Sequence, residues 1–531
     1  MSFSVALAWS LGRSALVAVA AAVAGRSVSR VLMEARGAVL TVCWILLLIP
    51  WLIPGLLLGY AWNGWVFAIH GWAVSRDLSG LTRIANLLLN HDRICNELAL
   101  CCLLFSRCLP WATVMLRWGV SGEESESSWF LRGLADGVAR VGRGRRPWTL
   151  FRRLRRESQR LAPAVGLAFI TCFQEFELVA RLGRPSWTVW LIDAHATGVA
   201  VSGLLFRATV AAGLQTLLVG AVLPVRQGLF TPGRGGRNEV NHGTWLRILV
   251  LGLLVAGAGA AVVIPSLSLA AGFLQGVSAL ADRTSVLLRL VREVSVGGAV
   301  ATIAATLAIL IARFLQTAPG QVESPSAISH ASPFPSRGWL GAVRVSGNWF
   351  LFWLGAWGAV PLCLLTLGSL APVGLASLGQ SLIPWCVVQS IWLFPRAVCL
   401  MSLVQVWRQP QPAYLGELLA SAPEADRRHS ADQLWWRDNW RNPVMAGLFL
   451  AMTAYFDLPT GQLLAPAGLA SAPVTLYTQM HYGRNSLLTA MTLLAVAIPW
   501  TLALFILLVL PRVTIWRRGR SIPPGGWSRS R

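Results

Sequence analysis

Long apolar runs recur along the whole chain, and they constrain its fold more than any other feature. A helix needs roughly 20 apolar residues to cross the hydrocarbon core of a bilayer. Eleven runs of about this length lie near residues 5–25, 38–60, 97–117, 163–182, 198–225, 247–271, 287–314, 346–371, 380–406, 444–464 and 486–511. They are too long and too uniformly apolar for barrel strands. The sequence therefore predicts an all-α integral membrane protein with about 11 transmembrane helices.

The composition excludes a soluble domain. Only 13% of the residues are charged and 55% are hydrophobic, whereas soluble domains carry about 25% charged residues. The 26 Trp residues fit a multi-pass protein whose indoles lie at the lipid–water boundary.

Positive charge alternates between the segments that connect these runs. All 45 basic residues are Arg; about 32 lie in one set of connecting segments and about 6 in the other. The Arg-rich segments are residues 26–37, 117–160, 226–247, 313–344, 407–442 and 512–531. By the positive-inside rule, these segments and the C-terminus are cytoplasmic and the N-terminus is external. This alternation explains the net charge of +23 without nucleic-acid binding.

The first 25 residues allow two interpretations. The stretch AVAAAVAG offers small residues at which a signal peptidase could cleave. However, no positive charge precedes the apolar run and Arg13 interrupts it. We therefore expect a first membrane span.

The residues that could ligate a metal ion do not form a metal-binding pattern. The cysteine cluster is Cys95, Cys101, Cys102 and Cys108, and it has no CxxC pair. The histidines His70, His91, His195 and His481 are scattered over expected external segments. We expect neither a metal site nor another cofactor.

An ordered set of residues recurs about 280 positions along the chain. The triplet Phe-acid-Leu follows 13 residues after Pro163 and again 13 residues after Pro443. An acid precedes the first proline by 27 residues (Asp136) and the second by 26 (Glu417). Further upstream, RCLPWATVML has a counterpart in WLFPRAVCLM. Fixed spacing at this range indicates an internal duplication.

The order of these motifs resembles the permease subunits of binding-protein-dependent ABC transporters, especially the fused two-half permeases of the ferric-iron and thiamine type. Their coupling loop reads EAA, three residues and Gly. Its counterparts are DGVARVG, with Asp136 and Gly142, and ELLASAP, with Glu417 and with Pro423 in place of Gly. DLPTGQLLAPAG is similar to the family's ELPATLLLRPFG. The family's Ile-x-Leu-Pro segment after the Gly is missing, so both coupling loops are degenerate.

The resemblance implies two tandem homologous permease halves in a cell inner membrane. The first half is expected at 1–226, with about five spans and a coupling loop at 117–162, and a cytoplasmic linker follows at 227–246. The second half is expected at 247–511, with about six spans, and it contains a Pro/Ser-rich loop at 316–345 and a coupling loop at 407–442. A basic cytoplasmic tail follows at 512–531.

The resemblance also implies a function and partners. The chain would carry a small solute across the membrane, and ferric iron is the candidate that the family likeness suggests. Cytoplasmic ATPase subunits would contact Asp136, Gly142, Glu417 and Pro423, and a periplasmic solute-binding protein would deliver the solute. The chain has no Lys and hence no Walker A loop. ATP hydrolysis would therefore reside in a separate subunit, and the chain itself would not be an enzyme.

Two acids lie within apolar runs and are the candidates for a translocation path. Burying an ionisable side chain in a membrane span costs roughly 2.5–3.5 kcal/mol, so it usually faces a partner or an aqueous path. Glu177 and Asp457 could flank a central path that favours a cation, with Pro459 breaking the helix beside it. Alternatively, each acid pairs with a nearby Arg, such as Arg181 or Arg207 for Glu177, and only holds helices together.

Two other functions stay open on the sequence alone. The degenerate coupling loops are compatible with a permease-like membrane scaffold that moves no solute. A polytopic membrane transferase is a further alternative, although that class would want a cluster of acids or histidines at one membrane face.

Overall fold

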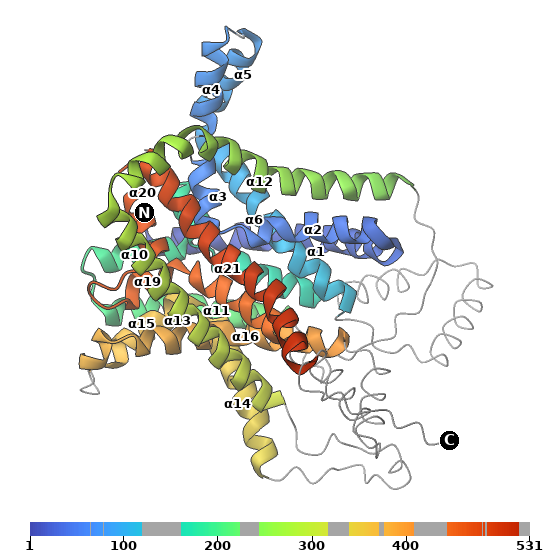
Figure 1. Ribbon diagram of the computed structural model, residues 1–531, viewed down its shortest axis with the longest axis vertical. Coiled ribbons are helices and arrows are strands. Elements are labelled where there is room, and N and C mark those ends of the chain that lie inside the picture. Colours follow the sequence, from blue (N-terminus) through green and yellow to red (C-terminus); the bar gives the residue numbers. More distant parts are fainter. Residues whose placement is uncertain are drawn as a thin grey trace, which may run out of the picture. The chain divides into compact units, whose positions relative to one another are not determined.

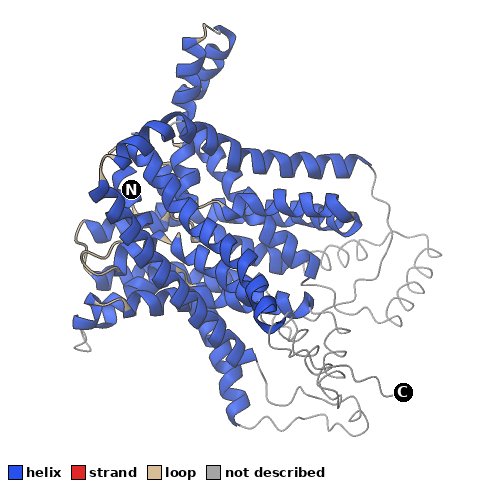
Figure 2. Ribbon diagram, viewed as in Figure 1, coloured by secondary structure: helices blue, strands red, loops and turns tan. Residues whose placement is uncertain are grey.

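The structure is a computed structural model that describes residues 1–63, 65–77, 79–118, 161–222, 244–316, 339–370, 376–407, 443–480, 482–483 and 486–519. Every regular element in these ranges is a helix (Figure 2). Seven of the helices are long and apolar enough to cross a membrane, and three bent helix pairs raise the candidate spans to as many as 10. The prediction of an all-α, multi-span membrane protein is confirmed.

The expected count of about eleven spans is too high for the described residues. Ten of the predicted runs coincide with a candidate span or a bent pair. The exception is the run at 163–182, where the helix Leu161–Phe173 stops and a short helix, α9 (Glu177–Arg181), follows. Gln174 and Glu175 occupy the break between them. Polar residues inside this run end the helix that hydropathy alone predicts to continue.

The helices form two compact units. The first comprises Met1–Ala271, Trp353–Leu378 and Leu458–Leu463, and the second comprises Gly272–Phe352, Gly379–Asp457 and Leu464–Arg531. The chain passes from one unit to the other within α12 (Thr244–Ala281), within α14 (Trp339–Ala356), within the short 3-10 helix η1 (Ala376–Gln380) and at both ends of α19 (Leu458–Leu464).

The first unit is built around the pair α1 and α6 (Figure 1). Its other helices, besides Leu161–Phe173 and α9, are α2, α3, α4, α5, α10, α11 and α15, together with the part of α12 up to Ala271 and residues Leu458–Leu463 of α19. Their bounds are α1 Phe3–Glu34, α2 Gly37–Leu52, α3 Gly55–Trp62, α4 Trp65–Ser75, α5 Ser79–Asn90, α6 Asp92–Trp118, α10 Trp187–Ala196, α11 Val201–Val222 and α15 Ala359–Leu370. Small residues let α1 and α6 approach closely, because a Cβ on Gly25 would lie only 3.1 Å from the Cβ of Ala112.

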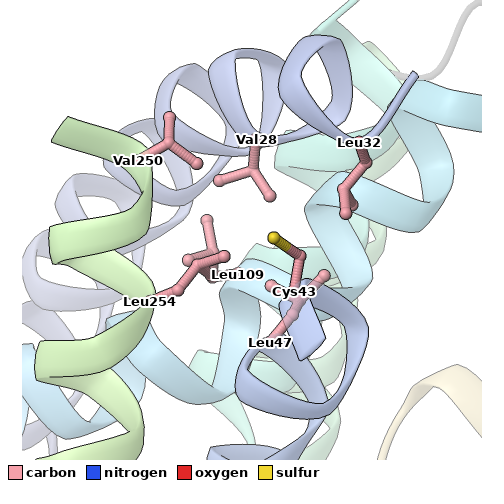
Figure 3. Close-up of a cluster of buried hydrophobic side chains, with 7 residues drawn as sticks. All are labelled: Val28, Leu32, Cys43, Leu47, Leu109, Val250 and Leu254. Atoms are coloured by element: carbon pink, nitrogen blue, oxygen red, sulfur yellow. The ribbon is translucent and has the colours of Figure 1, made fainter. Parts of the chain in front are cut away.

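An apolar cluster joins four helices of the first unit. It is formed by Val28 and Leu32 of α1, Cys43 and Leu47 of α2, Leu109 of α6, and Val250 and Leu254 of α12 (Figure 3). All seven side chains are buried. The first part of α12 therefore belongs to the core of this unit.

The second unit repeats the pairing of two long helices. Its helices are α13 (Thr284–Gln316), α16 (Ile383–Trp407), the helix Pro443–Tyr455, α20 (Ala472–Met480) and α21 (Ser486–Gly519), together with most of α14. Helix α13 packs along α16 and also contacts α20 and α21. Its buried side chains include the alanines Ala301, Ala304, Ala305, Ala308 and Ala312. A stripe of small residues again permits close packing.

Candidate functional site at broken membrane helices

The polar residues inside the apolar runs gather where membrane helices break. Lipid offers no partner for a freed N–H or C=O, so non-helical backbone at membrane depth must be satisfied by protein or water. The three bent pairs are Gly37–Leu52 with α3, Ser346–Ala356 with α15, and Pro443–Tyr455 with α19. The interruption between Phe173 and α9 is a fourth break.

The break before α3 is set by proline. Ile53 and Pro54 are extended, with ψ of 128° and 140°, and the helix axis turns by 80°. Pro54 cannot donate a backbone hydrogen bond, and it keeps the residue before it out of the helical conformation. Beyond the break, the N–H of Leu56 donates to Oε2 of Glu177 at 2.8 Å. The predicted acid therefore satisfies a backbone donor at the start of a broken helix.

Two glycines bring α3 and α9 together. A Cβ on Gly55 would lie 2.6 Å from Oε2 of Glu177, and a Cβ on Gly59 would lie 2.7 Å from the Cβ of Arg181. Glu177 and Arg181 are one helical turn apart on α9, as the two glycines are on α3. A larger side chain at either glycine would push the two helices apart.

An arginine of α6 lies beside the two acids at this break. Nη1 of Arg107 forms an ion pair with Oε2 of Glu175 at 3.2 Å. Nη1 also lies 2.7 Å from the position of a Gly55 Cβ, on the side where Glu177 lies. The other carboxylate oxygen of Glu175 accepts from the N–H of Leu178 at 3.2 Å. One arginine and two carboxylates thus meet at the start of α3 and α9.

Of the arginines that the sequence suggested as partners of Glu177, Arg181 lies one helical turn away on α9, and its pairing with the acid stays a prediction. The guanidinium of Arg181 lies 6.0 Å from the ring centre of Tyr60, and that of Arg207 lies 4.9 Å from the ring centre of Trp190. Arg107 and Glu175 were missed. The available signal was a charged residue inside an apolar run, which usually marks a polar contact.

The second acid lies in the second unit. Asp457 is only 8% exposed and falls at the break between Pro443–Tyr455 and α19. Arg396 of α16 interacts with it electrostatically, donates from Nη1 to the carbonyl of Trp392 at 3.0 Å and lies over the Trp392 ring. Pro459 is the second residue of α19, where its missing N–H breaks no helical hydrogen bond. The helix does break near Pro459, as the sequence predicted, at Phe456 and Asp457.

Side chains also cap the carbonyl groups that the breaks release. The indole of Trp187 donates to the carbonyl of Phe173 at 2.7 Å, and the amide of Gln389 donates to the carbonyl of Ala454 at 2.8 Å. Gln174 and Gln215 both donate to the carbonyl of Ala356. At that third break Gly358 has φ of +101°, and a Cβ there would lie 2.9 Å from Gln174. At these three breaks, protein side chains therefore satisfy backbone carbonyl groups.

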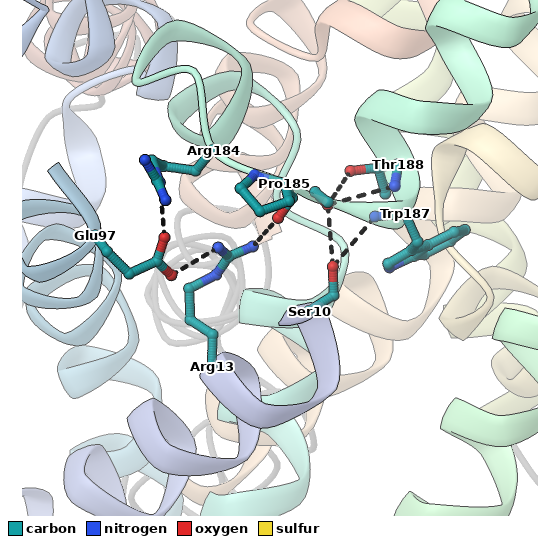
Figure 4. A network of polar contacts seen from close by, with 8 residues as sticks. Ser10, Arg13, Glu97, Arg184, Pro185, Trp187 and Thr188 are labelled. Atoms are coloured by element: carbon teal, nitrogen blue, oxygen red, sulfur yellow. Dashed lines mark hydrogen bonds and ion pairs between the residues drawn. The ribbon is translucent and has the colours of Figure 1, made fainter. Parts of the chain in front are cut away.

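A further charged network supports the loop between α9 and α10 (Figure 4). Glu97 of α6 accepts from Arg13 of α1 at 3.0 Å and from Arg184 at 2.9 Å. Arg13 also donates to the carbonyl of Pro185 at 3.1 Å, and Oγ of Ser10 accepts from the N–H of Trp187 at 3.2 Å. Two cations on one carboxylate fix this loop against α1 and α6.

The predicted ATPase-coupling residues Asp136, Gly142, Glu417 and Pro423 lie outside the described residues. Among the residues that the structure does describe, no three His, Cys, Asp or Glu side chains form a group that could hold a metal ion. Comparisons of the chain with protein-family models, with curated proteins and with solved structures found no match.

Proposed function

We propose that the protein is the transmembrane permease component of an ABC transporter. It consists of two tandem halves, moves a small solute across an inner membrane and is driven by separate ATPase subunits. A periplasmic binding protein supplies the solute. The proposal joins the resemblance of the sequence motifs to one observation, the recurrence of a single order of helices.

The order of helices supports the two halves. The first order is a long helix α1, the bent pair α2–α3, the additional hairpin α4–α5, a long α6, the broken helix Leu161–Phe173 with α9, a short α10 and a long α11. The second is a long α13, the bent pair α14–α15, a long α16, the broken helix Pro443–Tyr455 with α19, a short α20 and a long α21. Helix α12 stands between the two series.

Packing within the two units supports the same correspondence. Helix α1 contacts α6 and α10, just as α13 contacts α16 and α20. Helix α10 contacts α11, just as α20 contacts α21. Three contacts of the first series thus recur in the second.

Broken helices also fit a transport path. Unwound backbone in membrane transporters lies beside a cavity, because elsewhere in lipid it would be unsatisfied. Glu177 and Asp457, the two acids proposed for the path, each lie at a helix break and near an arginine of the long helix α6 or α16. Compensated carboxylates attract a cation less strongly than free ones, so the solute need not be cationic.

Association with an ATPase tests the proposal. The tagged full-length chain, purified from its own membrane, should bring down a nucleotide-binding subunit. Gly142→Asp adds a Cβ and a charge at the expected turn of the first coupling loop and should abolish this association, while Glu417→Arg should weaken it less. The matched control is Gly213→Ala on α11, where a Cβ meets nothing within 4 Å. A chain that never binds such a subunit would be a membrane scaffold instead.

Solute uptake tests the role of the acids. Asp457→Asn should reduce uptake more than it reduces the amount of folded protein in the membrane. If the acid only braces helices, uptake, yield and thermal stability should fall together. A double variant Glu177→Gln, Asp457→Asn with normal expression and full uptake contradicts both roles.

A further inference from the structure

The hairpin of α4 and α5 carries apolar side chains on its outside. The two helices pack on each other, with Val66, Ala73 and Ala85 buried at 2% exposure or less. The large side chains Trp72 and Val74 of α4, by contrast, are 54% and 53% exposed. Large apolar residues of α4 thus face outward. A hairpin surrounded by water would favour the opposite arrangement.

The two helices differ in their exposed faces. Arg83, Asn86 and Asn90 are exposed on α5 and, at spacings of three and four residues, form a polar stripe along that helix. The exposed side chain of Leu87 interrupts this stripe. Helix α4 has no charged residue between Trp65 and Ser75. The hairpin is therefore amphipathic as a whole, with its apolar side on α4 and its polar stripe on α5.

Chain connectivity holds the hairpin at the membrane surface. Helix α5 ends at Asn90, and the candidate span of α6 begins at Asp92. Two residues reach at most about 7 Å. On the other side, α4 starts at Trp65, three residues after the end of α3 at Trp62, and the rings of Trp62 and Trp65 lie 5.6 Å apart. In Figure 1 the hairpin extends beyond the ends of α3 and α6.

We infer that the apolar side of α4 lies in the interfacial layer of the bilayer, at the leaflet where α6 begins, with the polar stripe of α5 toward water. Tryptophan is favoured in this layer, and a helix with one apolar face lies in its plane. Ile94 and Leu98 of α6, each 61% exposed, continue the apolar surface from the hairpin into the membrane span. The inference rests on the membrane spans and not on the proposed transport function.

Lipid crosslinking of the unmodified full-length chain tests the inference. The chain is reconstituted into phosphatidylcholine–phosphatidylglycerol vesicles that contain a phospholipid with a diazirine near its headgroup, irradiated, and digested for mass spectrometry. Lipid adducts are expected on peptides covering residues 65–76. Leu217 of α11, 72% exposed, lies in a candidate span, and adducts placed on this helix by an acyl-chain diazirine are the positive control. Adducts on α11 with none on residues 65–76 would overturn the inference.

Site-specific quenching gives a second, independent measurement. A fluorophore is attached to Trp72→Cys or to Asn86→Cys in a chain whose own cysteines are replaced. Quenching by nitroxide phospholipid should be at least about threefold stronger at position 72, and iodide should quench more strongly at position 86. Equal quenching by iodide at both positions would contradict the inference. In the native membrane, protein rather than lipid crosslinks at 65–76 would assign this face to a partner protein and also overturn it.

Discussion

The helix breaks at Glu177 and at Asp457 both place acid side chains near an arginine, but the number of charged groups differs between them. At both, a Phe precedes the acid, the apolar helix has just ended, and an arginine comes from a long neighbouring helix. At the first break Arg107 meets two carboxylates, and one of them also holds the N–H of Leu56. At the second, Arg396 interacts electrostatically with one carboxylate, that of Asp457.

The two arginines occupy different positions relative to the proline of their helix. Arg107 lies three residues before Pro110 of α6, whereas Arg396 directly follows Pro395 of α16. Relative to the proline, the two arginines are thus about one helical turn apart. A long, flexible side chain can reach the same acid from neighbouring turns. Charge compensation at the break is common to both sites, while the residue that supplies it is not.

The largest expected loss of stability comes from substituting one of the two arginines, and it distinguishes the first break from the second. Arg107→Gln removes the cation beside Glu175 and Glu177, so two carboxylates face each other, and we expect a loss of about 3–5 kcal/mol of stability. Arg396→Gln should cost less, because only one carboxylate then loses its cation. Thermal unfolding of the purified variants in detergent measures both. Arg207→Gln, which loses only a ring contact worth about 0.5–1 kcal/mol, is the control. A larger loss for Arg396→Gln would reverse the comparison.

The stability losses caused by substituting the two acids should rank in the opposite order, with the larger loss at the second break. Asp457→Asn leaves the guanidinium of Arg396 without its carboxylate, and we expect a loss of about 2–3 kcal/mol. Glu177→Gln keeps an oxygen that accepts from Leu56, and Arg107 keeps Glu175, so the expected loss is about 1 kcal/mol. The same unfolding measurement decides. Equal losses would mean that the charge of Glu177, rather than its hydrogen bond, stabilises the first break.

The glycines of α3 test how closely the first break is packed. Gly55→Ala and Gly59→Ala each place a Cβ within 2.7 Å of α9 side-chain atoms, and overpacking of this kind costs about 1–3 kcal/mol. Gly213→Ala on α11 meets nothing within 4 Å and should be neutral or slightly stabilising. Unfolding temperatures of the three variants in one detergent provide the measurement. Unchanged stability of both α3 variants would show that α3 and α9 can separate freely.

The smallest effects should come from the glutamines that cap carbonyl groups. Gln389→Leu removes the amide that donates to Ala454, and we expect a loss of about 1 kcal/mol. Gln174→Leu should cost less at its break, because Gln215 also donates to the carbonyl of Ala356. Only the double variant Gln174→Leu, Gln215→Leu should match Gln389→Leu or exceed it. A single Gln174→Leu variant as damaging as the double one would rule out this redundancy.

The sequence predicts the helical membrane fold well, because long apolar runs leave few alternatives. It also predicts the helix break near Pro459, because proline acts locally on the backbone. It overestimates the run at 163–182, where an average over apolar residues hides Gln174 and Glu175. The arginine partners could not be predicted, since Arg107 and Glu175 are 68 residues apart and only packing brings them together. The coupling-loop residues Asp136, Gly142, Glu417 and Pro423 stay predictions.

The early end of the helix at Phe173 has a consequence for how the chain enters the membrane. The segment that follows carries Glu175 and Glu177 and would insert poorly by itself. Its partners Ser10, Arg13, Glu97 and Arg107 are all synthesised earlier, on α1 and α6. During biosynthesis the segment can therefore pack against helices that are already inserted in the bilayer. The order of synthesis thus helps to bury its charges.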